Sequence, residues 1–116
     1  MQGKRAERVA MLIKEELAPL LSRGLKDPRI GFVTITDVKM SDDLKYARVF
    51  YTVLGDEKVR EETAKGLEAA HGFLQRDIAN TLKLRFTPRL SFVLDASLDV
   101  GMKIDGIIRK IHEEQL

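Results

Sequence analysis

The 116-residue sequence predicts a single α+β domain, and three patterns carry that prediction. Apolar residues recur at helical spacing over residues 4–23, β-branched residues alternate with polar ones over residues 30–54, and helical spacing returns over residues 57–83. Such segments bury their apolar sides together when helices cover one face of a sheet. With 44% hydrophobic residues, the chain can form one compact core.

The first predicted helix runs from Lys4 to Arg23. Its apolar stripe consists of Val9, Leu12, Ile13, Leu17, Leu20 and Leu21. Pro19 lacks the amide hydrogen that the preceding turn would use, so we expect the last turn to be kinked or irregular. Gly24 is a natural residue for ending the helix.

Two strands follow, over residues 30–40 and 44–54, and we expect them to pair as a hairpin. The apolar residues of the first strand change parity between Ile35 and Val38. Either a β-bulge or coverage of both faces would explain this change, and we favour the bulge. Asp42 and Asp43 belong to the turn between the strands, where aspartate is favoured for backbone reasons.

Gly72 interrupts the second helical region. Because glycine inside a helix costs about 1 kcal/mol relative to alanine, we interpret it as a joint between a helix from about Glu57 to His71 and another that continues to about Lys83. A third strand follows over residues 89–97, and a last helix is expected from about Asp99. The predicted order is α-β-β-α-α-β plus a C-terminal helix, with a three-stranded sheet and helices on one face, forming a single domain over residues 1–116.

The sequence shows no signature of catalysis or metal binding. There is no cysteine, and the two histidines, His71 and His112, have no partner at metal-ligand spacing. The sequence also shows no phosphate-binding glycine loop, no secretory leader and no apolar run long enough to span a membrane. We therefore expect a cytoplasmic, monomeric protein that is not an enzyme and uses no cofactor, metal, membrane or small-molecule substrate.

Positive charge is concentrated in two parts of the chain, although the formal net charge is only +2. Residues 72–94 contain one acidic residue, Asp77, against four basic ones, Arg76, Lys83, Arg85 and Arg89. A second group, Lys4, Arg5 and Arg8, begins the first helix. The phenylalanines within 72–94 are Phe73, Phe86 and Phe92, and we expect core positions for them rather than base stacking.

The glycine joint could place this charge next to a phosphate-binding backbone. If the chain bends at Gly72, amides at the start of the following helix point outward at the positive end of its dipole. In KH modules a glycine-rich GxxG joint between two helices holds a nucleic-acid backbone in this way. Here Ala70, His71 and Gly72 occupy the corresponding place.

Four stretches resemble the ribosome-binding factor A family, and the resemblance extends over essentially the whole chain. They are DPR at 27–29, VTITDVKMSDDLKYARVFYTVL at 33–54, Ala-x-Gly at 70–72 and LKLRFTPRLSFVLDAS at 82–97. The resemblance implies a type II KH-like fold in which Ala-x-Gly replaces GxxG. It also implies binding to the 30S small ribosomal subunit and 16S rRNA, and a role in late 30S maturation, 16S rRNA processing and cold adaptation.

The candidate RNA-binding residues combine the joint with both cationic groups. They are Lys4, Arg5, Arg8, Ala70, His71, Gly72, Arg76, Lys83, Arg85 and Arg89. An alternative function is a protein interaction module that docks a partner through a sheet edge. A small hydrolase is the least favoured hypothesis, because no triad or metal set is present in the sequence.

Overall fold

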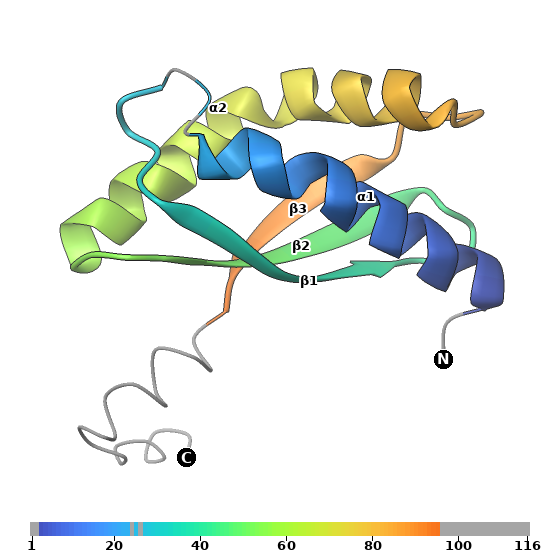
Figure 1. The fold of residues 1–116 in the computed structure, drawn as a ribbon, viewed down its shortest axis with the longest axis horizontal. Helices are drawn as coiled ribbons and strands as arrows, with labels where there is room; N and C mark the ends of the chain where they lie inside the picture. Colours follow the sequence, from blue (N-terminus) through green and yellow to red (C-terminus); the bar gives the residue numbers. More distant parts are fainter. Residues whose placement is uncertain (1–2, 24, 26, 96–116) are drawn as a thin grey trace, which may run out of the picture.

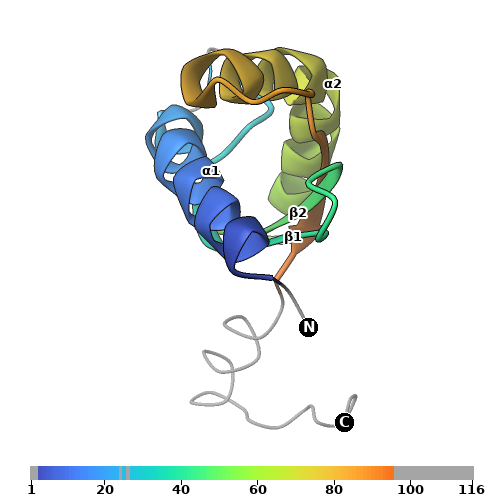
Figure 2. The same ribbon diagram turned by 90° about the vertical axis from the view of Figure 1, so that its right-hand side faces the viewer.

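The computed structural model describes residues 3–23, 25 and 27–95. Both described helices lie over the same face of a three-stranded sheet (Figures 1 and 2). The elements in chain order are α1 (Lys4–Ser22), β1 (Val33–Met40), β2 (Tyr46–Val53), α2 (Glu57–Leu82) and β3 (Arg89–Leu94). The predicted α+β class and the three-stranded sheet are confirmed. The C-terminal helix expected from about Asp99 lies outside the described residues.

The sheet has the order β1-β2-β3, so β2 is central. β1 and β2 form the predicted antiparallel hairpin, whereas β3 pairs with β2 in parallel after the long crossover through α2. The register of the hairpin shifts between Ile35 and Asp37, which confirms the predicted bulge. Because of this shift, Ile35 and Val38 are both buried on the core side.

α1 packs its apolar stripe against the sheet and ends at Ser22. The buried residues of α1 are Ala6, Val9, Ala10, Ile13, Leu17 and Leu21. Leu12, which the sequence placed in the stripe, is exposed instead. Pro19 lies within the helix close to its end, where the hydroxyl of Ser22 donates a hydrogen bond of 3.2 Å to the Pro19 carbonyl.

α2 is one continuous helix, although the sequence suggested two helices meeting at Gly72. Its ribbon changes direction between the first and second halves, which is plain in Figures 1 and 2. Asp56 caps the first turn by accepting a hydrogen bond from the Val59 amide at 3.1 Å. Leu67 in the first half and Leu74 in the second are both fully buried, so each half packs on the core. The predicted change of direction is present, and the helical backbone is not interrupted there.

The segment before β1 packs closely against α2 around Gly66. A Cβ atom added at Gly66 would lie 2.6 Å from Cγ1 of Ile30, so the absence of a side chain lets the buried Ile30 reach the helix. Thr63, one turn earlier, is fully buried and accepts a hydrogen bond from the Gly31 amide at 3.1 Å. These contacts fix the connection between α1 and β1 to the side of α2.

Two of the three phenylalanines expected in the core are on the surface. Phe73 is 52% exposed and Phe86 is 64% exposed. Only Phe92, on β3, packs partly against the core. The ring of Phe86 lies against the guanidinium of Arg85, one of the predicted cationic residues. Neither described helix has an apolar stretch of the length and hydropathy needed to cross a membrane.

Candidate nucleic-acid interface

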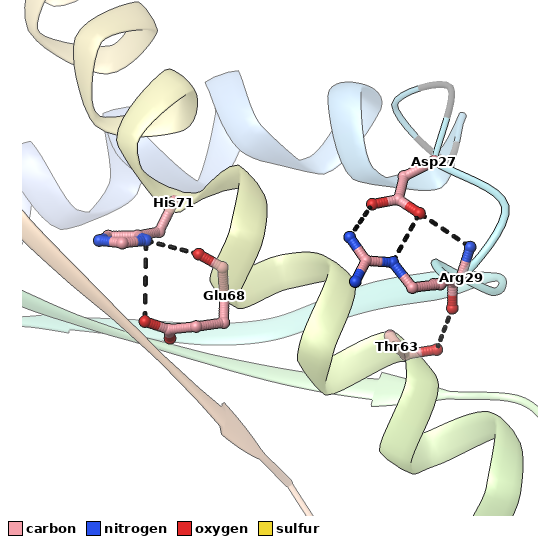
Figure 3. Close-up of polar contacts among 5 residues, drawn as sticks. All are labelled: Asp27, Arg29, Thr63, Glu68 and His71. Atoms are coloured by element: carbon pink, nitrogen blue, oxygen red, sulfur yellow. Dashed lines mark hydrogen bonds and ion pairs between the residues drawn. The ribbon is translucent and has the colours of Figure 1, made fainter.

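The change of direction in α2 carries a hydrogen bond between a side chain and the helix backbone (Figure 3). The ring of His71 contacts the carbonyl oxygen of Glu68, with 2.6 Å between Nδ1 and the oxygen. Because a carbonyl only accepts, Nδ1 must carry the hydrogen in this contact. In a regular helix that carbonyl accepts only from the amide of residue 72, so the His71 ring supplies an additional donor where the helix bends.

The carboxylate of Glu68 lies near the same ring, with 3.8 Å between Oε2 and Nδ1 of His71. The imidazole remains 41% exposed. Its second nitrogen points away from Glu68 in Figure 3. One edge of the ring is therefore used by the helix, and the other is directed away from these contacts.

Gly72 lies next to the guanidinium of Arg76. A Cβ added at Gly72 would be 3.6 Å from Nη1 of Arg76, an ordinary van der Waals distance. Arg76 is therefore folded back along the helix toward the bend. Ala70 is half-buried against the core, so its role at the bend is packing. His71, Gly72 and Arg76 form one group of predicted residues, which we call the bend group.

Three other predicted residues meet at a cavity of about 330 Å³. Arg5 comes from the start of α1, and Lys83 and Arg85 come from the segment that joins α2 to β3. The remaining lining residues are Asp43, Leu44, Leu84 and Phe86. We call this the end cavity, because it lies at the C-terminal end of α2. Lys83 follows Gly72 by eleven positions, which at 1.5 Å per helical residue is about 17 Å along the axis, so the bend group and the end cavity are distinct.

The other predicted cations lie outside both groups. Lys4 and Arg8 are exposed on the first turns of α1, on either side of Arg5, and do not line the end cavity. Arg89 is exposed at the start of β3, where its amide donates a hydrogen bond of 2.8 Å to the Lys45 carbonyl. The ten predicted residues therefore do not form a single surface.

Backbone and side-chain contacts hold the walls of the end cavity in place. The Gly3 amide donates to Oδ1 of Asp42 at 2.8 Å, which ties the start of α1 to the turn between β1 and β2. At the other wall, the Leu84 amide donates to the Ala79 carbonyl at 3.0 Å and closes the end of α2. The first contact holds the start of α1, with Arg5, beside the turn that carries Asp43 and Leu44, and the second fixes the backbone around Lys83.

Asp43 places a carboxylate in the wall of the cavity. The Ser41 hydroxyl donates to Asp43 Oδ1 at 2.7 Å, and the Lys45 amide donates to the same oxygen at 3.0 Å. Both hydrogen bonds lower the pKa of Asp43 below its usual value, and the bond from Ser41 has the larger effect. The cavity thus contains three cations and one stable anion. Sequence reasoning assigned Asp43 only to the turn, which is correct but incomplete.

Asp27 and Arg29 form a separate ion pair in the segment before β1 (Figure 3). Arg29 donates through Nη2 to Asp27 Oδ2 at 2.9 Å and through Nε to Oδ1 at 3.1 Å. The Arg29 side chain is the main reason that the pKa of Asp27 is lowered. Because its fork is engaged by Asp27, Arg29 serves the local fold. Within the described ranges, no group of three acidic or imidazole side chains has the arrangement of a metal site.

Comparisons with known proteins agree with the fold and with the resemblance in the sequence. The family model described as Ribosome-binding factor A matches residues 5–108. A Ribosome-binding factor A of Geobacter sulfurreducens is 47% identical over 111 residues, which is 96% of this chain and 94% of the relative.

Two solved structures are similar in fold. The crystal structure of ribosome-binding factor A from Thermus thermophilus aligns with a TM-score of 0.66 at 26% identity, covering 77% of this chain and 94% of that one. Coordinates of the Thermus thermophilus factor fitted into a cryo-EM map of a 30S-RbfA complex align with a TM-score of 0.57 at 25% identity, covering 73% and 93%. The chain therefore belongs to the ribosome-binding factor A family.

Proposed function

We propose that this protein binds the 30S small ribosomal subunit by contacting 16S rRNA, and that it assists late 30S maturation and 16S rRNA processing. One observation carries the proposal: the chain belongs to the ribosome-binding factor A family. A structurally similar relative was fitted into the map of a 30S-RbfA complex. On this proposal the chain is a single cytoplasmic, monomeric KH-like domain that acts by binding, without catalysis, and supports growth at low temperature.

The bend group and the end cavity are the surfaces that we assign to the RNA. Each presents exposed cations, Arg76 at the bend and Arg5, Lys83 and Arg85 at the cavity. Lys4, Arg8 and Arg89 add exposed charge near the ends of their elements. Contacts between such side chains and phosphates release counterions, so binding should weaken steeply as salt is raised.

A salt series with charge reversals tests this proposal. Arg76→Glu should lower co-sedimentation with immature 30S particles at moderate salt by about tenfold, because it replaces a phosphate contact by repulsion. Lys65→Glu is the matched control, since Lys65 is an exposed cation of α2 outside both surfaces. If wild-type binding hardly changed with salt, or if the two variants behaved alike, the assignment of RNA contact to the bend group would be wrong.

The alternative function, docking of a protein partner through a sheet edge, has a structural basis because β1 and β3 are the edges of the sheet. It predicts binding to isolated ribosomal proteins that is insensitive to Arg76→Glu. Comparing binding to 16S rRNA with binding to the protein fraction of the subunit separates the two functions.

A further inference from the structure

We propose that the end cavity is a nucleotide-binding pocket, which stacks an unpaired RNA base on Phe86 and holds the adjoining phosphate with Arg5, Lys83 and Arg85. The inference rests on the proposed function and adds to it the chemical class of ligand that the end cavity holds and the role of Phe86 there. Three observations support it: an exposed aromatic ring, a local excess of cations, and unusual backbone at two lining residues.

Phe86 has the properties of a stacking platform. Phe86 is 64% exposed even though it lines the cavity. The guanidinium carbon of Arg85 lies 5.6 Å from the ring centroid, a cation-π contact that orients both side chains. A ring that is held in place and accessible can stack any nucleobase, since every base has a π-face.

The charges around the ring suit a nucleotide better than a neutral apolar ligand. Three cations face one carboxylate in the lining, so positive charge is in excess. Arg5 comes from α1 and Lys83 from the residue that follows α2, so they can hold a phosphate from two sides. The volume, about 330 Å³, is at the lower end of the range for small-ligand sites. This size suits one nucleotide rather than a longer stretch of RNA.

Two lining residues adopt a backbone conformation that is costly for their type. Leu44 has φ of 63° and Lys83 has φ of 56°, both in the left-handed region that favours glycine. The residue after a helix commonly is glycine in this conformation, yet the residue that caps the end of α2 is Lys83. Strained residues are frequently retained at ligand-binding sites. At position 83, a lysine side chain supplies a charge to the cavity that glycine would not.

The stacking part of the proposal is tested with Phe86→Leu. The probes are a fluorescent octauridylate and an octamer of abasic spacers, which keeps the phosphates and lacks the bases. Wild type should bind octauridylate roughly tenfold more tightly than the abasic octamer, and Phe86→Leu should lose most of that preference. The matched control is Phe32→Leu, because Phe32 is 62% exposed and precedes β1, about 26 Å along the strand from the end that meets the cavity.

The phosphate part is tested with Lys83→Gly. Glycine relieves the left-handed backbone, so the variant should melt at a temperature roughly 4 to 8 °C higher. It should nevertheless bind octauridylate more weakly, and the slope of log K against log salt should fall by about 0.7. A lysine that served only to end the helix would give the higher melting temperature with unchanged binding, which would overturn the role of Lys83.

Binding to immature 30S particles separates failure of this inference from failure of the proposed function. If wild type binds the particles and octauridylate but Phe86→Leu behaves as Phe32→Leu with both, the pocket is wrong and the proposed function stands. If wild type binds neither, both are overturned. Competition by uridine monophosphate against the fluorescent octauridylate tests the source of the nucleotide. A pocket for RNA predicts that the monophosphate competes only weakly. If it competed as well as unlabelled octauridylate at the same concentration, the site would bind free nucleotides instead of RNA.

Discussion

Gly66 and Gly72 both lie in α2, and their surroundings give them opposite roles. The helical pattern marked Gly72 as the exceptional residue, but a Cβ there meets only Arg76 Nη1 at an ordinary 3.6 Å. A Cβ at Gly66 would lie 2.6 Å from Ile30 Cγ1, an atom bonded to the branched Cβ of a buried side chain, so it cannot easily move. The requirement at Gly66 comes from a segment far earlier in the chain, which helical periodicity does not reveal.

The two glycines predict stability changes of opposite sign. Gly72→Ala should raise the free energy of unfolding by up to about 1 kcal/mol, because alanine is the better helix former and has room. Gly66→Ala should lower it by about 1 to 3 kcal/mol, because the buried Ile30 must shift. Urea denaturation of both variants measures the difference. A stabilised Gly66→Ala would show that this close packing is not required.

The candidate site was predicted unevenly at the residue scale. The cations were recognisable because charge is visible in the sequence, and Arg5, Lys83 and Arg85 do meet. Phe86 was misplaced because an aromatic residue between polar ones is more often buried than exposed. Nothing in the sequence signals that Leu44 and Lys83 take left-handed backbone, since non-glycine residues rarely do so.

At the scale of elements, α1 and α2 place two carboxyl groups near each other, those of Glu16 and Asp77. Oδ2 of Asp77 is buried without a hydrogen-bond donor among the described residues. Because an ionised carboxylate has no hydrogen to donate, a hydrogen bond between the two carboxyl groups requires that one of them is protonated. The pKa of Glu16 is raised, first by hydrogen bonding to Asp77, then by burial and by the charge of Asp77, while Thr81 opposes the change.

This pair makes the contact between the helices sensitive to pH. A carboxyl whose pKa is higher in the folded state contributes stability below its unfolded pKa of about 4.3, and that contribution is lost as pH rises through the folded pKa. Glu16→Gln supplies a permanent amide donor, so it should stabilise the protein at pH 7 by about 1 kcal/mol. It should also flatten the decline in stability above pH 4.

Thermal melting of Glu16→Gln between pH 4 and 8 tests this prediction, with Glu15→Gln as the control because Glu15 is exposed on the same helix. Equal changes in the two variants would mean that the contact with Asp77 is not the cause.

The elements themselves were largely predictable from periodicity. The bulge in β1 was predicted because the change of apolar parity is a local signal, and the shift between Ile35 and Asp37 confirms it. The continuity of α2 was not predicted. The cost of one glycine, about 1 kcal/mol, is outweighed by burial of Leu67 and Leu74 on either side, and this packing is a tertiary effect.

At the scale of the whole molecule, the cations fall into two groups on one continuous helix and its neighbours. The bend group lies midway along α2, and the end cavity lies where α2, the start of α1 and the turn after β1 meet. The sequence suggested a charged flank beside a joint, with a second cationic group at the start of the first helix. It could not show the separation, because the position of Arg5 depends on the Gly3–Asp42 contact between distant segments.

Binding of immature 30S particles by Arg76→Gln, Arg85→Gln and the double variant tests the two-surface account most directly. Because the two arginines belong to separate groups, the account predicts that each substitution weakens binding and that the two free-energy losses add within about 0.5 kcal/mol. If either single variant bound as wild type does, or if the double variant bound no more weakly than one single variant, the result would contradict the account of two independent RNA contacts.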